Sequence, residues 1–99
     1  MKNYLIVGHS NDITATGTLE EWKTYYSEVV GEALVDGGNP VVSKTVVRGG
    51  NVSDATDDTV VGYYIIKAES RDAAIAMVKQ SPMANNDGCE ARVYELAQM

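Results

Sequence analysis

The residues best suited to acid–base chemistry follow the first apolar run of the chain. His9 comes directly after YLIVG at residues 4–8, and an unperturbed imidazole titrates near pH ~6.5, so it can exchange a proton close to neutrality. Asp12 lies three residues further on and could orient the ring through a hydrogen bond. We therefore predict His9 and Asp12 as a catalytic pair. The alternative is a strand-end histidine beside an aspartate that caps a turn.

Three other side chains are candidates for ligand binding. The planar guanidinium of Arg48 could hold a carboxylate or a phosphate, although a surface ion pair with Asp54 or Asp58 is an equal alternative. Trp22 and Tyr64 are the aromatic residues that we expect to line an apolar pocket, while most of the other aromatic side chains belong to the core.

The sequence predicts no metal site and no cofactor. Asp54, Asp57 and Asp58 are close in sequence, but they lack the ligand spacing and the closing glutamate of a calcium loop, so we expect a solvated turn. The glycine pairs at 37–38 and 49–50 do not join a strand to a helix, as phosphate-binding loops do. Cys89, the single cysteine, is expected to be a small strand residue in a reducing compartment.

Length and charge limit the partners of this protein. The 99 residues fit one domain, residues 1–99, and the net charge of −6 disfavours nucleic acid and anionic membranes as partners. No segment approaches the ~20 apolar residues that cross a bilayer. The first nine residues lack the features of a secretory signal. We therefore expect a soluble cytoplasmic protein.

Residues 59–67, with the sequence TVVGYYIIK, form a strand that is apolar on both faces, and residues 4–8 share this pattern. Capping signatures at Thr18 with Glu21 and at Ser70 predict two helices. Alternating polarity predicts two edge strands. In chain order the expected elements are a strand at 4–8, a helix from 18 to the glycines at 37–38, strands at 41–48 and 59–67 joined by a long loop, a helix from 70 to Pro82, and a strand at 90–96.

This β-α-β-β-α-β order predicts an α+β, ferredoxin-like fold. Its antiparallel sheet has the strand order 4-1-3-2, and both helices cover one face. The opposite face is then left bare and apolar. Since burial of apolar area drives association, we predict a homodimer that forms through the sheet face.

Four segments resemble the YCII-related family, particularly its DGPF-like branch: YLIVG, EALVDGGNP, TVVRGGNVSDATDD and VGYYIIKAESRDAAIAMVKQSP. The resemblance implies a dimeric α/β barrel. Residues 53–56 replace the Asp-Gly-Pro-Phe that this branch often carries. Some members are thought to pair an acid at the end of strand one with a histidine in the first turn of helix one. This chain has His9 at the first place and Glu20 and Glu21 near the second, so that activity is not carried over.

The leading hypothesis is a homodimer with a cleft between sheet and helices that binds a small organic molecule. A lyase-like or isomerase-like reaction would use His9 for proton transfer and Arg48 as an anion clamp. The alternative is a non-catalytic module that binds a small molecule or another protein. The fold does not distinguish between these two hypotheses.

Overall fold

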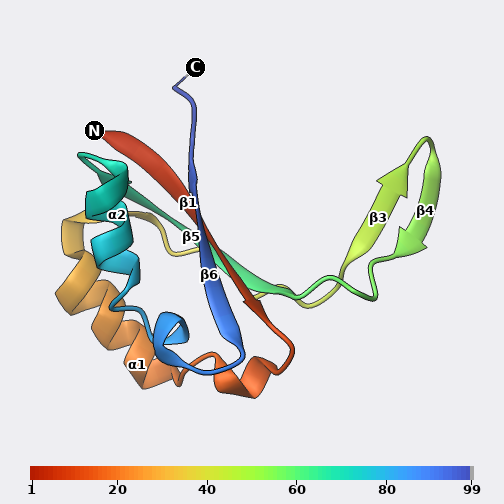
Figure 1. Cartoon of the computed structure of the whole chain (residues 1–99), viewed down its shortest axis with the longest axis horizontal. Helices are drawn as coiled ribbons and strands as arrows, with labels where there is room; N and C mark the ends of the chain where they lie inside the picture. The colour runs from red at the N-terminus through yellow and green to blue at the C-terminus, as the bar shows by residue number, and fades with distance from the viewer. Residues whose placement is uncertain (99) are drawn as a thin grey trace.

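Four antiparallel strands form the main sheet of the computed structural model, which describes residues 1–98 (Figure 1). The strands lie in the order β2-β5-β1-β6. Counted along the chain within this sheet, that order is 4-1-3-2 read from the other edge, so the predicted α+β, ferredoxin-like fold is confirmed. The strands are β1 (Lys2–Ser10), β2 (Leu34–Asp36), β5 (Val60–Ala68) and β6 (Cys89–Glu95).

The helices begin where the sequence predicts. The hydroxyl of Thr18 accepts a hydrogen bond from the Glu21 amide at 3.1 Å, and the Glu21 carboxylate accepts one from the Thr18 amide at 2.9 Å, which completes the capping box before α1 (Leu19–Thr24). Ser70 caps α2 (Arg71–Val78) through the Ala73 amide. Short 3₁₀ turns lie at η1 (Ile13–Ala15) and η4 (Met83–Asn85). Within the described range, no helix combines the length and the apolar character needed to span a bilayer.

One face of the sheet holds the core. Alternate residues of the two central strands point toward the helices and are buried, while the residues between them reach the other face. The largest buried side chains from the strands meet buried side chains of the helices: Tyr4, Ile6, Tyr64 and Ile66 pack with Tyr25, Val30, Ala74 and Val78.

The opposite face has no helix over it and is called the bare face from here on. In Figure 1 the helices lie on one side of the sheet only. The bare face carries half-buried Leu5 and Val7 together with residues opposite them in the strand register. These are Ile65 and Tyr63 on β5 and Tyr94 and Arg92 on β6. Both central strands therefore present apolar side chains on two faces.

The first helical segment ends earlier than the glycines at 37–38. α1 continues into a π-helical turn, η2 (Tyr25–Val30), and a 3₁₀ turn, η3 (Gly31–Ala33). Gly31 has a φ of +53°, which interrupts the helical backbone. The chain then enters β2, where Leu34 pairs with Ile66 at the sheet edge. The predicted helix end was wrong because the edge of β5 recruits these residues.

The second predicted strand was placed too late in the chain. Residues 41–48 were expected at the sheet edge, but β2 holds that position. Only Pro40 and Val41 reach β5, through a bridge to Gly62 and a 2.9 Å hydrogen bond to the Val61 carbonyl. β3 (Thr45–Arg48) instead pairs with β4 (Asn51–Asp54) in a separate two-stranded sheet. Gly49 and Gly50, with φ of +56° and +82°, make the tight turn between them.

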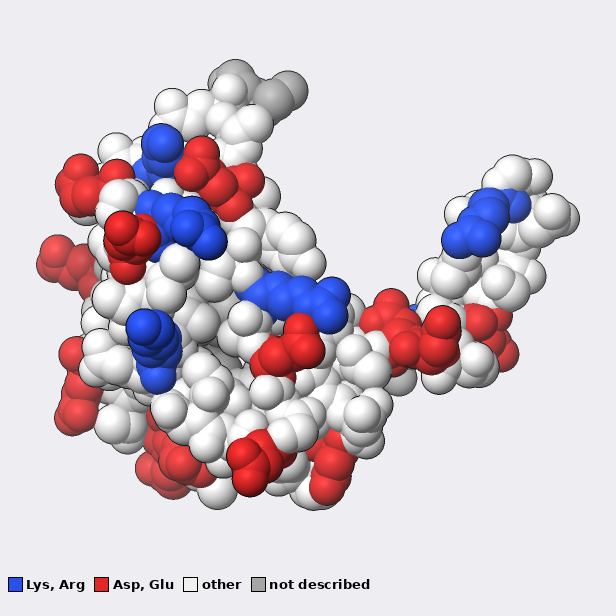
Figure 2. All heavy atoms as spheres, in the orientation of Figure 1, with Lys and Arg blue, Asp and Glu red and all other residues white. Residues whose placement is uncertain are grey.

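This hairpin, called the arm (residues 45–54), projects from the domain on the side away from the helices (Figure 1). The radius of gyration of the chain is 14.3 Å, against roughly 13 Å for a compact domain of this length. In Figure 2 an open hollow separates the arm from the body, and acidic atoms gather at its root. The arm is therefore an extension outside the packed domain.

Candidate functional site

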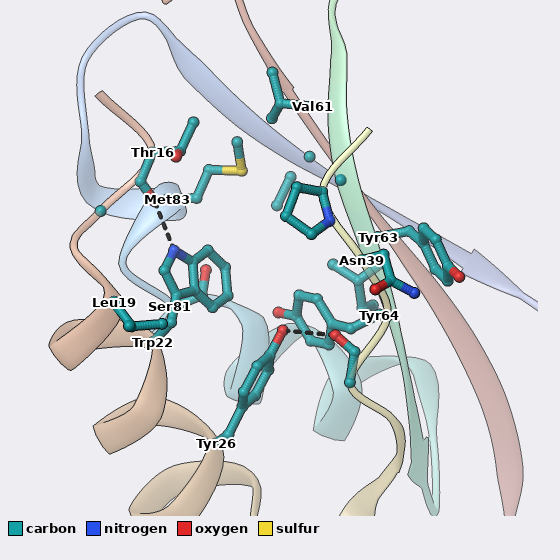
Figure 3. A pocket seen from close by; sticks show the side chains of 18 residues that line it. Thr16, Leu19, Trp22, Tyr26, Asn39, Val61, Tyr63, Tyr64, Ser81 and Met83 are labelled. Carbon is teal, nitrogen blue, oxygen red and sulfur yellow. Dashed lines mark hydrogen bonds between the residues drawn. The ribbon is translucent and has the colours of Figure 1, made fainter. Parts of the chain in front are cut away.

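A cavity of about 440 Å³ lies between the helix side of the sheet and the segment that contains α1 and η2. Ile6, Val61 and Ala91 contribute from the strands, Trp22 and Tyr26 from the helical side, and Met83 from η4. The predicted cleft between sheet and helices is thus present. Figure 3 shows Trp22 and Tyr64 among the side chains that line this cavity.

Trp22 is fixed by the capping box that begins its helix. Its indole N–H donates to the Thr16 carbonyl over 2.8 Å, a bond drawn in Figure 3. Leu19, in the first turn of α1, lies at the same wall with 69 % of its surface exposed. Because the start of the helix and the indole N–H are both held, the wall formed by Trp22 is preorganised.

Four aromatic rings form a single cluster beside the cavity. The ring centroids of Trp22 and Tyr64 lie 5.9 Å apart at an interplanar angle of 72°, which is an edge-to-face contact. Tyr25 and Tyr26 are consecutive in η2, and both contact Trp22, at centroid distances of 5.7 and 5.6 Å. Tyr25 is buried in the core, whereas Tyr26 lines the cavity. π-helical turns of this kind often occur at functional sites.

The hydroxyl groups of these tyrosines are engaged within the protein. Tyr64 and Tyr25 share a hydrogen bond of 2.9 Å, and Tyr25 also donates to the Met77 carbonyl at 3.3 Å, so Tyr64 is the donor of the first bond. Tyr26 donates to the Gly37 carbonyl at 3.2 Å. The protons of these hydroxyls are already used in hydrogen bonds within the protein. Towards a ligand, the hydroxyl oxygens would therefore act as acceptors.

Burial keeps these phenols neutral. Desolvation, together with the neighbouring Tyr25, raises the pKa of Tyr26 to about 12 and raises the pKa of Tyr64 well above its ordinary value. Burial also raises the pKa of Tyr25. Among the described residues that line the cavity, none is Asp, Glu, His, Lys or Arg. The cavity therefore suits the binding of an uncharged molecule better than proton abstraction.

Backbone forms much of the remaining wall. Gly38 has a φ of +67°, and a Cβ atom added there would collide with the Tyr63 carbonyl. Its amide donates to the Asp36 carboxylate at 2.8 Å. Gly62 stands opposite residues 39–40. Glycine is therefore required where the loop after β2 approaches β5 to close the cavity.

His9 lies in a different place. It belongs to the same side of β1 as Leu5 and Val7, so it is on the bare face and is not among the residues that line the cavity. Its Nδ1 is 2.9 Å from the hydroxyl oxygen of Thr59. In the sheet register His9 is opposite Glu90, whose pKa is lowered by the hydrogen bond and charge of Arg92 at 2.6 Å.

The other two candidates are also apart from the cavity. The Asp12 carboxylate accepts from the amide and the hydroxyl of Thr14 at 3.0 and 2.6 Å, which lowers the pKa of Asp12 and caps the turn after β1. Arg48 is exposed at the tip of the arm. Of the five predicted site residues, the structure brings together only Trp22 and Tyr64. Tyr26 was among the aromatic residues of which most were expected in the core, whereas sequence patterns gave no reason to choose Gly38 or Met83.

The match to a family model decides the family. The model of the YCII-related domain matches residues 5–97. The chain belongs to the YCII-related domain family. This YCII-related chain has no match among the curated proteins. Among solved structures it is similar to 5-chloro-2-hydroxyhydroquinone dehydrochlorinase from Burkholderia phenoliruptrix AC1100 in complex with 2,5-dihydroxybenzoquinone, with 17 % sequence identity, a TM-score of 0.50, and coverage of 91 % of this chain and 90 % of that chain. This likeness supports the fold of the YCII-related domain.

Proposed function

We propose that this protein binds a flat, uncharged organic molecule in the cavity between sheet and helices, and that it does so as a homodimer. The observation that carries the proposal is the aromatic wall made by Trp22 and Tyr64 around a cavity of about 440 Å³. Small-molecule sites commonly enclose roughly 300–1,000 Å³ and are lined mainly by apolar and aromatic side chains.

The chemistry of the lining supports an uncharged ligand. A carboxylate or an ammonium group in this cavity would lose its hydration without gaining an oppositely charged partner, which is costly. The neutral phenol of Tyr26 and the amide of Asn39 can contact polar atoms of a ligand at the cavity edge. A structural neighbour of the same fold is described in complex with 2,5-dihydroxybenzoquinone, a single flat ring. That protein is a dehydrochlorinase, and its chemistry is not transferred to this chain.

Catalysis is the second candidate function, and the contact between His9 and Thr59 favours it. This hydrogen bond fixes one ring nitrogen, a common arrangement for a histidine that transfers protons. A lyase-like or isomerase-like reaction would then take place on the bare face. Such a site would have to be closed by a second copy of the chain, and Arg48 would act there as the anion clamp. Assignment to the DGPF-like branch belongs to the same proposal and rests on the matching segments of sequence.

Trp22 provides the test, because it is the only tryptophan in the chain. The protein is titrated with 2-acetonaphthone, a neutral bicyclic ketone, and with naphthalene-2-carboxylate, which has the same rings and a negative charge, while tryptophan fluorescence is recorded. We expect the ketone to bind at least tenfold more tightly. Equal affinity for the carboxylate, or no response to either compound, would contradict the proposal.

A pair of variants locates the binding site. Ala91 lines the cavity, so Ala91→Phe fills it, whereas Ala84 is exposed on η4 and does not line it. We expect Ala91→Phe to weaken binding of 2-acetonaphthone at least tenfold and Ala84→Phe to leave it unchanged. Circular dichroism of both variants establishes that the fold is retained.

A further inference from the structure

The arm carries an apolar surface that nothing in its own protomer covers. Val47 and Val52 are opposite each other in the β3–β4 register, so their side chains are on one face of the hairpin, and they are 70 % and 69 % exposed. Val42, at the root of the arm, is 95 % exposed. An isolated two-stranded hairpin is marginally stable in water at best. Such a hairpin with exposed valines needs a partner surface.

The place of the arm indicates which surface that is. In Figure 1 the arm extends from the side of the sheet opposite the helices, which is the side of the bare face. Its root and the strand ends of the body enclose a hollow of about 560 Å³ that includes Ser10, Val42 and Val60. A second copy seated on the bare face would therefore lie directly beside the arm.

The area of the bare face supports the same assignment. Four strands spaced about 4.8 Å apart, with about seven residues each at about 3.3 Å per residue, present a flat area of roughly 450 Å². A stable interface buries about 800 Å² on each partner. The flat footprint of the sheet is thus smaller than the accessible area that a stable interface buries on one partner. The arm adds the exposed side chains of Val47 and Val52 on that side of the molecule.

Charge agrees with this arrangement. Residues 45–53 contain a single charged side chain, Arg48, while the chain as a whole has a net charge of −6. In Figure 2 the cationic atoms on the outer part of the arm stand apart from the acidic atoms at its root. An arm tip of positive charge is attracted to an acidic body, whereas two acidic bodies repel each other.

We infer that the arm of each protomer packs on a second copy of this chain, with the Val47–Val52 face buried against the partner. This inference rests on the homodimer of the proposed function and adds the surface that completes it. Two arms related by a twofold axis would each contact the other protomer, as a symmetric interface requires. Arg48 follows Val47 in β3 and pairs with Asn51, so it is on the other face of the arm, and it is not near the cavity of its own protomer.

The test compares two double variants that add the same charge to opposite faces of the arm. V47D/V52D alters the buried face, and N51D/S53D alters the other face of the same hairpin. Light scattering over a dilution series gives the dimer dissociation constant of the full chain. We expect V47D/V52D to raise that constant at least a hundredfold. N51D/S53D leaves the valine face intact and only offsets the charge of Arg48, so we expect it to raise the constant by less than tenfold. Circular dichroism should show an intact body in both.

Each outcome decides a separate point. A wild-type protein that stays monomeric at high micromolar concentration would overturn the homodimer and the arm inference together, while the cavity could still bind its ligand. A wild-type dimer that V47D/V52D leaves intact would overturn the arm inference alone, as would equal weakening by both double variants. Hydrogen exchange gives an independent measure: amides in residues 45–54 should become more protected as protein concentration rises.

Discussion

The hydroxyl of Tyr64 on β5 donates to the hydroxyl of Tyr25 on η2 over 2.9 Å, and this bond joins the sheet to the helical segment at the base of the cavity. The Tyr25 hydroxyl donates its own hydrogen bond to the Met77 carbonyl of α2. The elements η2, β5 and α2 are therefore connected by one chain of hydrogen bonds. The aromatic cluster holds the same elements together through ring contacts.

Tyr64→Phe tests the contribution of this chain to stability. The substitution keeps the ring and removes the hydroxyl that bonds to Tyr25 and to the Ser81 side chain, so we expect the free energy of unfolding to fall by about 1–3 kcal/mol. Urea denaturation measures the change. Tyr63→Phe is the matched control, because Tyr63 is the adjacent residue and is 36 % exposed. Equal stability of the Tyr64→Phe variant and the wild type would count against a structural role for the bond.

Alkaline pH should weaken the fold through Tyr26. The pKa of Tyr26 is about 12 in the folded protein, against about 10 in an unfolded chain. The folded state holds this proton more strongly, so its stabilising effect is complete below pH ~10 and is lost as the pH rises toward ~12. Unfolding of wild type and Tyr26→Phe across this range should show a shallower loss in the variant. Parallel curves would contradict the assignment.

Gly38→Ala should destabilise the wall of the cavity. An alanine at φ +67° costs about 1–2 kcal/mol, and its Cβ would also collide with the Tyr63 carbonyl. Together these effects predict a loss of about 2–4 kcal/mol in the free energy of unfolding. Gly37→Ala is the control, since the nearest atom to an added Cβ there is a Leu34 methyl carbon at 4.0 Å. Similar stability of the two variants would show that residue 38 is not constrained.

The positions of the two central strands and of the last strand, and the sites of helix initiation, could be predicted from the sequence. The capping box at Thr18 and Glu21 is a local signal, and so is the serine cap at Ser70, because each depends on residues within one turn. The apolar pattern of residues 59–67 likewise gave a central strand. Local patterns of this kind determine the elements before any long-range contact forms.

The edge strand and the site depended on which distant segments of the chain pair with each other, and local sequence patterns do not determine that choice. Residues 41–48 alternate as a strand should, but the tight turn at Gly49 and Gly50 pairs them with β4, while Leu34 takes the edge of β5. Facing arguments selected Trp22 and Tyr64, and both side chains line the cavity; their part in ligand binding stays a prediction. Successive residues of β1 point to opposite faces of the sheet, and the sequence did not show which face the helices cover. It therefore could not show whether His9 points into the cleft.

His9→Ala separates binding in the cavity from chemistry on the bare face. His9 is on the other face of the sheet from the cavity, with its Nδ1 bonded to Thr59. We expect the variant to bind 2-acetonaphthone with the affinity of the wild type in the same fluorescence titration. A loss of binding of tenfold or more in a folded variant would place His9 in the ligand site and favour the catalytic hypothesis.

The most direct test of the central claim is a nuclear Overhauser measurement on the protein with 2-acetonaphthone bound. Protons of the ketone should give cross-peaks to the indole of Trp22, the ring of Tyr26 and the methyl group of Met83, all of which line the cavity. Cross-peaks to Leu5, Val7 and Tyr94 instead would place the ligand on the bare face and contradict the account.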